Sequence, residues 1–365
     1  MEYLKGINLK GKTIKFPIYF PDATRAVVRS LDSNDLQKAG IEGVVVNTYH
    51  LMSQPGATVI KQAGGIKKFM NWPGFVASDS GGFQILSLIQ RNSSAGSITD
   101  KGIIFRSGSK KTIFSPEKSI QVQFALDPDI IVCLDDFTPP RAKLEEIEIS
   151  VNRTVEWAKR CKEEFIKHVE REKLSVENRP LLLGVIQGGD DKLMRERCAK
   201  ELLKIGFDGY GFGGWPLDKN GKLNFEITSF TASLTPDDIP RFALGVGNPQ
   251  NILDCFRCGY HIFDCVLPTR DARHRRLYVF SRNPDEPDFL ETEQVHDYLY
   301  ILKAKYNGDK RAISEHCDCF TCQNYTRAYL HHLFRIQDAL AWRLATIHNL
   351  RMYTRLTEKL RGYIK

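Results

Sequence analysis

The chain contains short apolar runs that end abruptly in glycine, amide or acidic residues. Continuous runs of Val, Ile and Leu are typical of strands that are buried on both faces, as in a parallel sheet. The pattern therefore predicts parallel strands that each lead into a polar or glycine-rich loop. Six such runs lie at residues 41–50, 74–82, 129–137, 180–189, 241–249 and 260–268.

Helical patterns lie between these runs. The segment 115–126 begins with Ser115, followed by Pro116, which suits the first helical position. A long charged helix is expected over 143–173, and an amphipathic one over 191–206 that ends at a glycine. Alternation of strands and helices over roughly 250 residues predicts a parallel α/β fold.

The strand ends distinguish between an open sheet and a closed barrel. An open doubly wound sheet gathers its site at one switch point, whereas a (β/α)8 barrel draws site residues from many strand ends. Polar residues end at least five of the runs, which favours the barrel. No glycine-rich nucleotide-cofactor motif is present. We expect a (β/α)8 TIM-type barrel with a short N-terminal extension over 1–285, and a zinc-binding helical subdomain over 286–365.

Composition limits the class of protein. The 365 residues are 42% hydrophobic and 26% charged, which excludes a disordered chain, a collagen and a coiled-coil rod. No run reaches the roughly 18 apolar residues of a membrane helix, and the N-terminus does not resemble a signal peptide. We expect a soluble cytoplasmic protein without membrane contact. The net charge of +8 fits either ordinary solubility or a polyanionic partner.

Nine cysteines without a signal peptide argue against a disulfide framework. Cys317, Cys319 and Cys322 form C-x-C-x-x-C, and His348 follows 26 residues after the last of them. Three thiolates and one imidazole make a closed, structural Zn²⁺ site. Three inert buried cysteines are the alternative interpretation. On spacing alone, other histidines compete as the fourth ligand: His316, His331 and His332.

Four carboxylates end apolar runs: Asp79, Asp135, Asp136 and Asp264. A carboxylate at such a position is unfavourable unless it is solvated, paired or functional. One could act as a nucleophile and another as a general acid or base, as retaining glycosyl transfer requires. Each could instead cap the following helix.

Glycine pairs at 81–82, 188–189 and 213–214 offer exposed amides and close backbone approach, which suit a flat ligand. Gln187 can donate and accept hydrogen bonds, as the edge of a nucleobase demands. Phe83 could stack on such a base or belong to the core.

Basic residues follow Asp264 closely. A surface of this kind is either merely solvated or binds phosphates, which would position a nucleic acid without reading its sequence. The expected RNA contacts are Arg270, Arg273, His274, Arg275 and Arg276, with further cations at Arg351, Arg355, Lys359 and Arg361 on the C-terminal helix.

Several motifs together resemble one family. They are NTYHL (47–51), SDSGGFQ (78–84), SPEKS (115–119), GFDGY (206–210), GVG (245–247), FDCVLPTR (263–270) and the C-x-C-x-x-C…His set. The chain resembles the tRNA-guanine transglycosylase (queuine tRNA-ribosyltransferase) family over nearly its whole length. The resemblance implies a zinc-containing barrel that exchanges a guanine in tRNA for a 7-deazaguanine.

The resemblance also implies roles. Asp264 matches the nucleophile that forms a covalent RNA intermediate, and Asp79 matches the general acid/base. Arg270 and Arg273 match backbone contacts, His348 becomes the fourth zinc ligand, and a homodimer is expected. The implied base-binding set is Asp79, Ser80, Phe83, Asp135, Gln187, Gly213, Gly214 and Leu244.

Two departures leave the incoming base open among preQ1, queuine and preQ0. Trp215-Pro216 stands where bacterial members tend to have small residues, and Phe137 stands where a cysteine is common. The sequence ends at residue 365, without archaeal C-terminal RNA-binding domains, so we expect an anticodon-loop guanine.

Three other functions compete with this one. A paralogue could insert preQ0 into DNA or another RNA position, and a partner subunit could bind RNA without catalysis. A metal-dependent barrel hydrolase would need an open metal site at the barrel face. Retention of both Asp79 and Asp264 favours the transglycosylase.

Overall fold

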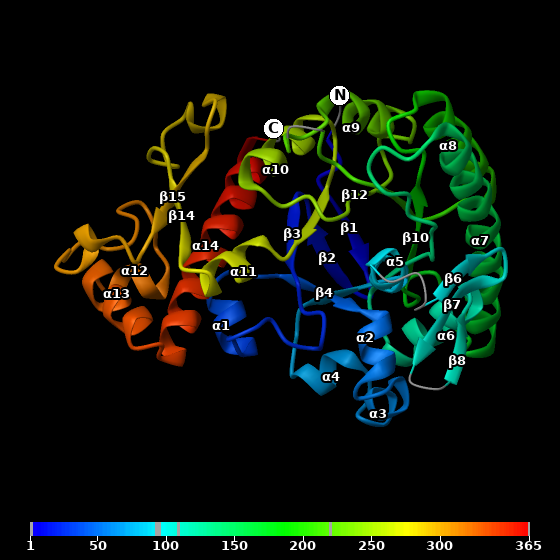
Figure 1. Ribbon diagram of the computed structural model, residues 1–365, viewed down its shortest axis with the longest axis horizontal. Helices are drawn as coiled ribbons and strands as arrows, with labels where there is room; N and C mark the ends of the chain where they lie inside the picture. Colours follow the sequence, from blue (N-terminus) through cyan, green and yellow to red (C-terminus); the bar gives the residue numbers. More distant parts are fainter. Residues whose placement is uncertain (1–2, 92–95, 108–109, 219–220, 364–365) are drawn as a thin grey trace.

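The computed structural model describes residues 3–91, 96–107, 110–218 and 221–363. Within these ranges, eight parallel strands form one barrel (Figure 1). A parallel bridge between Asp22 and Val45 joins the first and last strands of the sheet and closes the ring. The predicted (β/α)8 barrel is confirmed. In order around the ring the strands are β3 (Ile18–Pro21), β13 (Ile262–Cys265), β12 (Arg241–Ala243), β11 (Gly209–Phe212), β10 (Leu181–Ile186), β9 (Ile130–Val132), β5 (Phe75–Asp79) and β4 (Gly43–Asn47).

The six predicted runs each contain one barrel strand. The other two strands, β3 and β11, were not predicted. Prolines flank the Ile-Tyr-Phe core of β3, and β11 reads Gly-Tyr-Gly-Phe. Neither presents the Val/Ile/Leu run on which the strand prediction depends.

The three predicted helices are confirmed within two residues at either end. They are α6 (Pro116–Leu126), α7 (Leu144–Arg171) and α8 (Lys192–Ile205). The Ser115 hydroxyl caps α6 by accepting from the Lys118 amide at 3.2 Å. Gly206 follows α8 with a φ of 78°, a left-handed value that favours glycine.

Further helices complete the outer layer and connect the strands. After β3 and β4 come α1 (Ser33–Lys38), α2 (Thr48–Ser53), α3 (Ala57–Gln62) and α4 (Ile66–Met70); after β5 comes α5 (Gly82–Arg91); after β11, β12 and β13 come α9 (Phe225–Ser233), α10 (Pro249–Arg257) and α11 (Leu267–Arg273).

Two small antiparallel sheets are attached to the barrel. A three-stranded antiparallel sheet lies between α5 and α6, formed by β6 (Gly96–Thr99), β7 (Gly102–Ser107) and β8 (Lys110–Phe114). The hairpin of β1 (Gly6–Leu9) and β2 (Lys12–Lys15) packs Leu9 and Ile14 against residues of the barrel interior. Its Lys12 ammonium donates to the Pro73 carbonyl, just before β5. The hairpin therefore covers the amino-terminal end of the barrel and leaves the carboxyl-terminal end open for a site.

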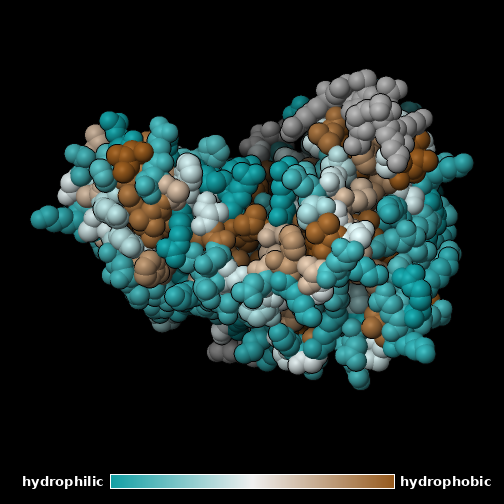
Figure 2. All heavy atoms as spheres, turned by 90° about the horizontal axis from the view of Figure 1, so that it is seen from below, coloured by the Kyte–Doolittle hydropathy of each residue, from teal (hydrophilic) through white to brown (hydrophobic). Residues whose placement is uncertain are grey.

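The C-terminal part forms a lobe on one side of the barrel (Figure 1). It contains the hairpin of β14 (Arg276–Phe280) and β15 (His296–Tyr300), whose connection includes η2 (Phe289–Glu291). After the hairpin come η3 (Ala304–Tyr306), α12 (Phe320–Asn324), α13 (Arg327–Arg335) and α14 (Ala339–Tyr363). Seen from below, the lobe projects from one end of a largely hydrophilic surface (Figure 2).

The helix α14 belongs to both parts of the molecule. It packs on α12, α13 and β14 in the lobe, and on β3, α10 and α11 of the barrel. The domain boundary expected at residue 285 lies in the loop of the β14–β15 hairpin. That residues 286–365 form a separate subdomain stays a prediction. No helix of the described residues is long and apolar enough to cross a membrane.

Candidate active site and metal centre

The carboxyl ends of the parallel strands meet at one rim of the barrel, where (β/α)8 enzymes place their sites. The rim receives Asp79 from the end of β5 and Asp264 from β13. Asp135 and Gln187 follow β9 and β10 within three residues, and Gly213 follows β11 directly. The structure therefore brings the predicted catalytic and base-binding residues to a single face.

The Asp79 carboxylate is held by four hydrogen bonds from the end of β4, the start of α2 and the segment around the start of α5. Its Oδ2 accepts from the Asn47 amide group at 2.8 Å and from that of Gln84 at 3.3 Å. Its Oδ1 accepts from the backbone amides of Gly81 at 3.0 Å and Thr48 at 3.3 Å. The carboxylate is thus fixed in position at the end of its strand.

The carboxylate of Asp264 has one hydrogen bond among the described residues, from the Gly245 amide to its Oδ1 at 2.8 Å. Its second oxygen is left available to a ligand. The adjoining Cys265 is buried, and its carbonyl accepts from the Tyr19 hydroxyl at 2.8 Å. The backbone that carries Asp264 is therefore anchored from both β3 and the β12–α10 loop.

Burial raises the pKa of Asp79 to about 7, and the charge of Asp264 adds to the increase. Burial also raises the pKa of Asp264 to about 7, with a contribution from the charge of Asp22. The charge of Asp264 therefore favours the protonated form of Asp79. Two carboxyl groups with raised pKa values can supply one carboxylate and one carboxylic acid near neutral pH.

Asp135 and Gln187 form a second polar group. The Gln187 Nε2 donates to Asp135 Oδ2 at 2.6 Å. Gln187 is fully buried, and its Oε1 has no partner among the described residues. Burial raises the pKa of Asp135 to about 6, although hydrogen bonds from Gln187 and Ser80 oppose this. An unpaired buried oxygen beside a carboxyl group is suited to a ligand that offers hydrogen-bond donors.

The glycine pair after β11 passes close to Gln187. A Cβ on Gly213 would lie 2.6 Å from Gln187 Nε2, so a larger residue would displace the amide. Gly214 has a φ of +96°. Between the neighbouring strands β11 and β12, a Cβ on Gly211 would lie 2.8 Å from Leu244 Cδ1. Because these positions carry no side chain, the backbone of the Gly213–Gly214 loop lies directly beside the polar group of Asp135 and Gln187.

Phe83 lies at the start of α5 and is 46% exposed. Its ring contacts Phe137 edge to face, with the centroids 5.0 Å apart. The side chain is therefore not a core residue, and its exposed aromatic ring is of a kind that can stack on a flat ligand.

Asp136 has a different environment. Its carboxylate is buried and forms an ion pair with Arg153 from α7 at 2.5 Å. The backbone amide of Asp136 donates to Thr154 Oγ1 at 3.0 Å. This aspartate joins α7 to the loop after β9 by an ion pair, whereas the N-cap of α7 is Lys143.

The loop that departs from the family pattern follows Gly214. The Trp215 side chain is exposed. The Pro216 carbonyl accepts from the Asn224 amide at 2.9 Å, and a bridge joins Leu217 to Leu223. Residues 219–220 of this loop lie outside the described ranges.

The basic segment lies on α11 and the turn after it. Arg270, His274 and Arg275 are exposed. Burial, followed by the charges of Arg29 and Arg270, lowers the pKa of Arg273, so these cations share one surface. Arg276 differs, because it pairs with Asp271 at 2.7 Å and covers the ring of Tyr298.

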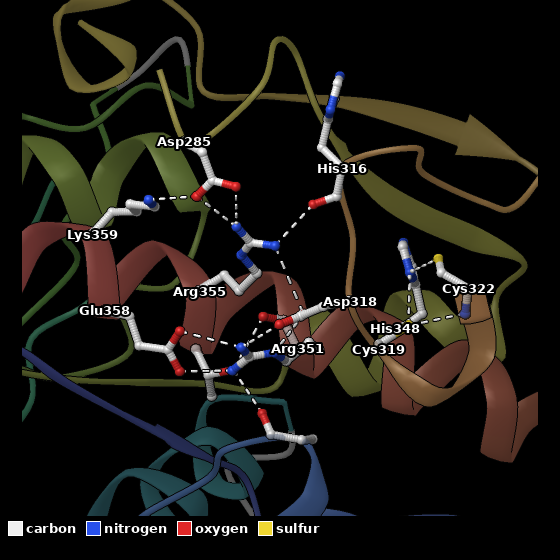
Figure 3. Close-up of polar contacts among 12 residues, drawn as sticks. Asp285, His316, Asp318, Cys319, Cys322, His348, Arg351, Arg355, Glu358 and Lys359 are labelled. Carbon is white, nitrogen blue, oxygen red and sulfur yellow. Dashed lines mark hydrogen bonds and ion pairs between the residues drawn. The ribbon is translucent and has the colours of Figure 1, made fainter. Parts of the chain in front are cut away.

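The cations of α14 are already paired within the chain (Figure 3). Arg351 binds Asp318 and Glu358, each at 2.7 Å. Arg355 binds Asp285 at 2.9 Å, and Lys359 binds the same carboxylate. Arg361 is paired with Glu42 at 2.5 Å. These ion pairs connect α14 to the lobe and the barrel. The cations of α14 are therefore occupied by carboxylates and are not free for phosphates.

The predicted metal ligands converge in the lobe. The ligand atoms of Cys317, Cys319, Cys322 and His348 all lie within 4.8 Å of one another. His348 Nδ1 is 3.3 Å from Cys322 Sγ and 3.6 Å from Cys319 Sγ, close to the ligand separations of a tetrahedral site with ~2.0–2.3 Å bonds. His348 Nε2 contacts the Tyr278 carbonyl at 2.6 Å, which directs the other ring nitrogen to the thiols. The group can hold one metal ion.

Comparisons with known proteins agree with this geometry. The sequence model of a family described as "Queuine tRNA-ribosyltransferase" matches residues 4–365. The chain belongs to this family. A queuine tRNA-ribosyltransferase of Staphylococcus aureus (strain bovine RF122 / ET3-1) is 38% identical over 354 residues, covering 96% of this chain and 85% of the relative. One from Caldanaerobacter subterraneus subsp. tengcongensis is 39% identical, covering 96% of this chain and 87% of the relative. The resemblance inferred from the motifs is confirmed.

Sequence reasoning missed several rim residues of this queuine tRNA-ribosyltransferase family member. Asn47 and Gly245 hold the two catalytic candidates, and from the β3–α1 loop the charge of Asp22 acts on Asp264 while that of Arg29 acts on Arg273. Asn47 and Gly245 lie inside the family motifs NTYHL and GVG, so their position at strand ends could have indicated a role at the rim. Asp22 follows a strand that the sequence did not reveal. Arg195 is fully buried in α8. The amphipathic pattern of this helix did not distinguish it from a surface arginine.

Proposed function

We propose that this chain is a tRNA-guanine transglycosylase, a pentosyltransferase that replaces an anticodon-loop guanine with preQ1 or queuine. The observation that carries the proposal is the presence of two buried carboxyl groups at one rim, Asp79 at the end of β5 and Asp264 in β13, each with a pKa of about 7. They share a barrel rim with Gln187, whose Oε1 has no partner among the described residues. Membership of the queuine tRNA-ribosyltransferase family supports the same reaction.

The proposed chemistry is a double displacement at the ribose. The Asp264 carboxylate attacks C1′ and forms an ester-like bond to it, while the bond between C1′ and guanine N9 breaks. Asp79, as the acid, provides the proton for the departing base. Asp79 then takes a proton from the incoming 7-deazaguanine, which attacks C1′ and releases Asp264. Two inversions restore the original β-configuration.

The base would lie between the two catalytic carboxyl groups and the polar group formed by Asp135 and Gln187. Its hydrogen-bonding edge would face Asp135, Gln187 and the Gly213–Gly214 amides, with Ser80 supporting Asp135. Phe83 and Leu244 would contact its two faces. Shape and polarity of this kind suit guanine and its 7-deaza analogues. Trp215 directly follows Gly214. A substituent at position 7 of the base would meet the loop that begins there and differs from the family pattern.

The tRNA backbone would follow the basic surface beside Asp264. Arg270, Arg273, His274 and Arg275 are its expected contacts, with Arg276 holding the turn through Asp271. Phosphate contacts of this type position the RNA and make binding sensitive to salt. We also propose that the protein acts in the cytoplasm and as a homodimer, in which one subunit reacts while the other holds RNA.

Zinc is the proposed metal. Three thiolates and an imidazole form a closed tetrahedral set without an open position, and they lie in the lobe rather than at the barrel rim. When bound, the ion supplies cross-linking of α12 to α14 and takes no part in the reaction.

The decisive experiment is exchange of labelled guanine. Purified protein receives unmodified tRNA with a G-U-N anticodon, beside RNA and DNA controls, and preQ1, queuine and preQ0 compete for incorporation. Label in the tRNA alone is expected, together with competition by preQ1 or queuine. Label in DNA, or competition by preQ0 only, would favour the paralogous transglycosylase. RNA binding without any exchange would indicate a partner subunit and contradict the proposal.

Asp264→Asn tests the covalent step. The variant should bind tRNA with a Kd within about twofold of the wild type, because the nucleophile contributes little to backbone binding. It should lose exchange by more than about 10³-fold. A covalent RNA–protein band on a denaturing gel should form with the wild type and vanish with the variant. Exchange at the wild-type rate would overturn the nucleophile assignment.

A further inference from the structure

Arg195 is a buried cation at the base of the active-site rim. It lies in the first turn of α8, directly behind the loops that follow β10 and β11, and is 1% exposed. In the described part of the chain all its hydrogen bonds go to backbone carbonyls, and none to a carboxylate. Burial lowers the pKa of its guanidinium to about 10, so the group remains charged at neutral pH.

The guanidinium connects two loops. Its Nε donates to the Gly189 carbonyl at 2.7 Å and its Nη1 to the Ile186 carbonyl at 3.3 Å, both around Gln187. Its Nη2 donates to the Gly213 carbonyl at 3.0 Å in the loop after β11. The plane lies over the Phe212 ring, 4.2 Å from the centroid. Arg195 therefore fixes both loops relative to one another.

These bonds also set the direction of the donors that face the base. In a planar trans peptide the carbonyl and the amide hydrogen point in opposite directions. Because Arg195 holds the Gly213 carbonyl, the Gly214 N–H must point away from the guanidinium. The Ile186 carbonyl likewise fixes the peptide that contains the Gln187 amide. A Cβ on Gly214 would lie 3.5 Å from both Arg195 Nη2 and Gln187 Oε1, so the three groups are adjacent.

The glycines of the loops make this restraint necessary. Gly188, Gly189 and Gly214 have φ values of +141°, +55° and +96°. Glycine peptides rotate more freely than others, so the loops would otherwise populate several orientations. A buried guanidinium with no carboxylate partner is unfavourable by itself. Its rigid set of five donors is suited to holding several carbonyls at once.

We propose that Arg195 is the positioning residue of the base site, which aligns the Gly214 N–H and the Gln187 side chain toward the edge of guanine and its 7-deaza analogues. The inference rests on the proposed function of that site. Arg195 touches neither substrate nor reacting atoms. Its loss should therefore weaken binding of the base more than binding of tRNA.

The experiment compares Arg195→Lys and Arg195→Met with a matched control, Arg241→Lys. Arg241 is equally buried and donates to the Thr235 and Gly259 carbonyls, but it begins β12 at the opposite end of the barrel. The KM values for guanine and for tRNA are measured separately, with thermal unfolding as a measure of stability. Methylguanidinium is then added to each variant.

The expected result is a rise of about tenfold or more in the guanine KM of both Arg195 variants, with the tRNA KM within about twofold. Added methylguanidinium should restore part of the guanine affinity of Arg195→Met. Arg241→Lys should unfold at a lower temperature and keep its guanine KM. An unchanged guanine KM in folded Arg195→Lys would overturn the inference, as would equal increases in the Arg195 and Arg241 variants.

Two further variants separate other causes. If the Arg195 variants do not fold, Phe212→Leu removes the ring under the guanidinium and leaves its hydrogen bonds in place. A guanine KM raised about threefold is then expected, and an unchanged value overturns the inference. Gln187→Leu tests the base site itself. A normal guanine KM in that variant would instead refute the proposed function of the site.

Discussion

The Tyr353 hydroxyl donates a hydrogen bond to the Gly247 carbonyl at 2.5 Å. Tyr353 is fully buried on α14, five residues after the proposed metal ligand His348. Gly247 lies two residues after Gly245, whose amide binds Asp264. One hydrogen bond therefore connects the metal-binding helix to the loop that positions the proposed nucleophile.

Tyr353→Phe should reduce kcat while leaving the metal in place. The substitution removes one oxygen and leaves the Gly247 carbonyl without its partner, so the Gly245 amide is held less firmly. We expect a three- to tenfold lower kcat and a loss of about 1 kcal/mol in the free energy of unfolding. Steady-state kinetics, chemical denaturation and metal analysis measure the three quantities.

Tyr260→Phe is the matched control. Tyr260 is equally buried and donates to the Thr228 carbonyl at 3.1 Å, before β13 at the amino-terminal end of the barrel. It should lose similar stability and keep its kcat. Equal kcat losses in both variants would refute the connection between α14 and Asp264.

The raised pKa of Asp264 predicts a stability that depends on pH. Below a pH of about 4 the carboxyl group is protonated in both the folded and the unfolded state. Above its folded pKa of about 7 it is ionised in a buried site, and the folded state is destabilised. Asp264→Asn should therefore increase the free energy of unfolding at pH 8 by about 1–3 kcal/mol, and change it little at pH 4.

Asp208→Asn should show the opposite sign. Burial opposes its ionisation, but hydrogen bonds from Arg179 and the Leu182 amide hold the pKa of Asp208 below its usual value. Its contribution to stability is present at neutral pH and is lost in acid. Denaturation curves from pH 4 to pH 8 test both variants. A destabilised Asp264→Asn protein at pH 8 would contradict the raised pKa.

The fold could be predicted because its determinants are local. Buried parallel strands need continuous apolar runs, and caps such as Ser115 and Gly206 are visible in short segments. The strands β3 and β11 escaped because prolines and glycines replace the expected aliphatic residues. Their place in the ring is determined by neighbouring strands, which a local pattern does not report.

The candidate site could be predicted only in part. Asp79, Asp264 and Gln187 follow recognisable strands, so their meeting at one rim follows from the parallel topology. The ion pairs of Arg351 and Arg355 with Asp318 and Asp285 depend on how the lobe folds back on α14. Such partners lie more than 30 residues away in sequence, and a helical charge pattern alone does not distinguish them from free cations.

Asp22→Asn should shift the pH dependence of kcat/KM. Asp264 must be ionised to attack C1′, so activity falls as the pH decreases through its pKa of about 7. The charge of Asp22 helps to raise that pKa. Without it, the acidic limb should move down by about half a pH unit.

Asp238→Asn makes the same change in net charge on an exposed residue just before the amino end of β12. Its profile should match the wild type. An acidic limb that stays in place in Asp22→Asn would show that Asp22 does not influence the nucleophile.

Metal removal should loosen the lobe before the barrel. Cys319→Ser removes one of the four ligands, and the lobe loses the cross-link between α12 and α14. We expect less than one zinc per chain, compared with one in the wild type, and a loss of about 3 kcal/mol or more in unfolding free energy. Cys258→Ser, a buried thiol at the end of α10, should keep its zinc. Because α14 also carries Tyr353, hydrogen exchange should increase first in α12 and α14 and then in the Gly245–Gly247 loop. A metal-free Cys319→Ser protein with wild-type stability and exchange would refute a structural role for the ion.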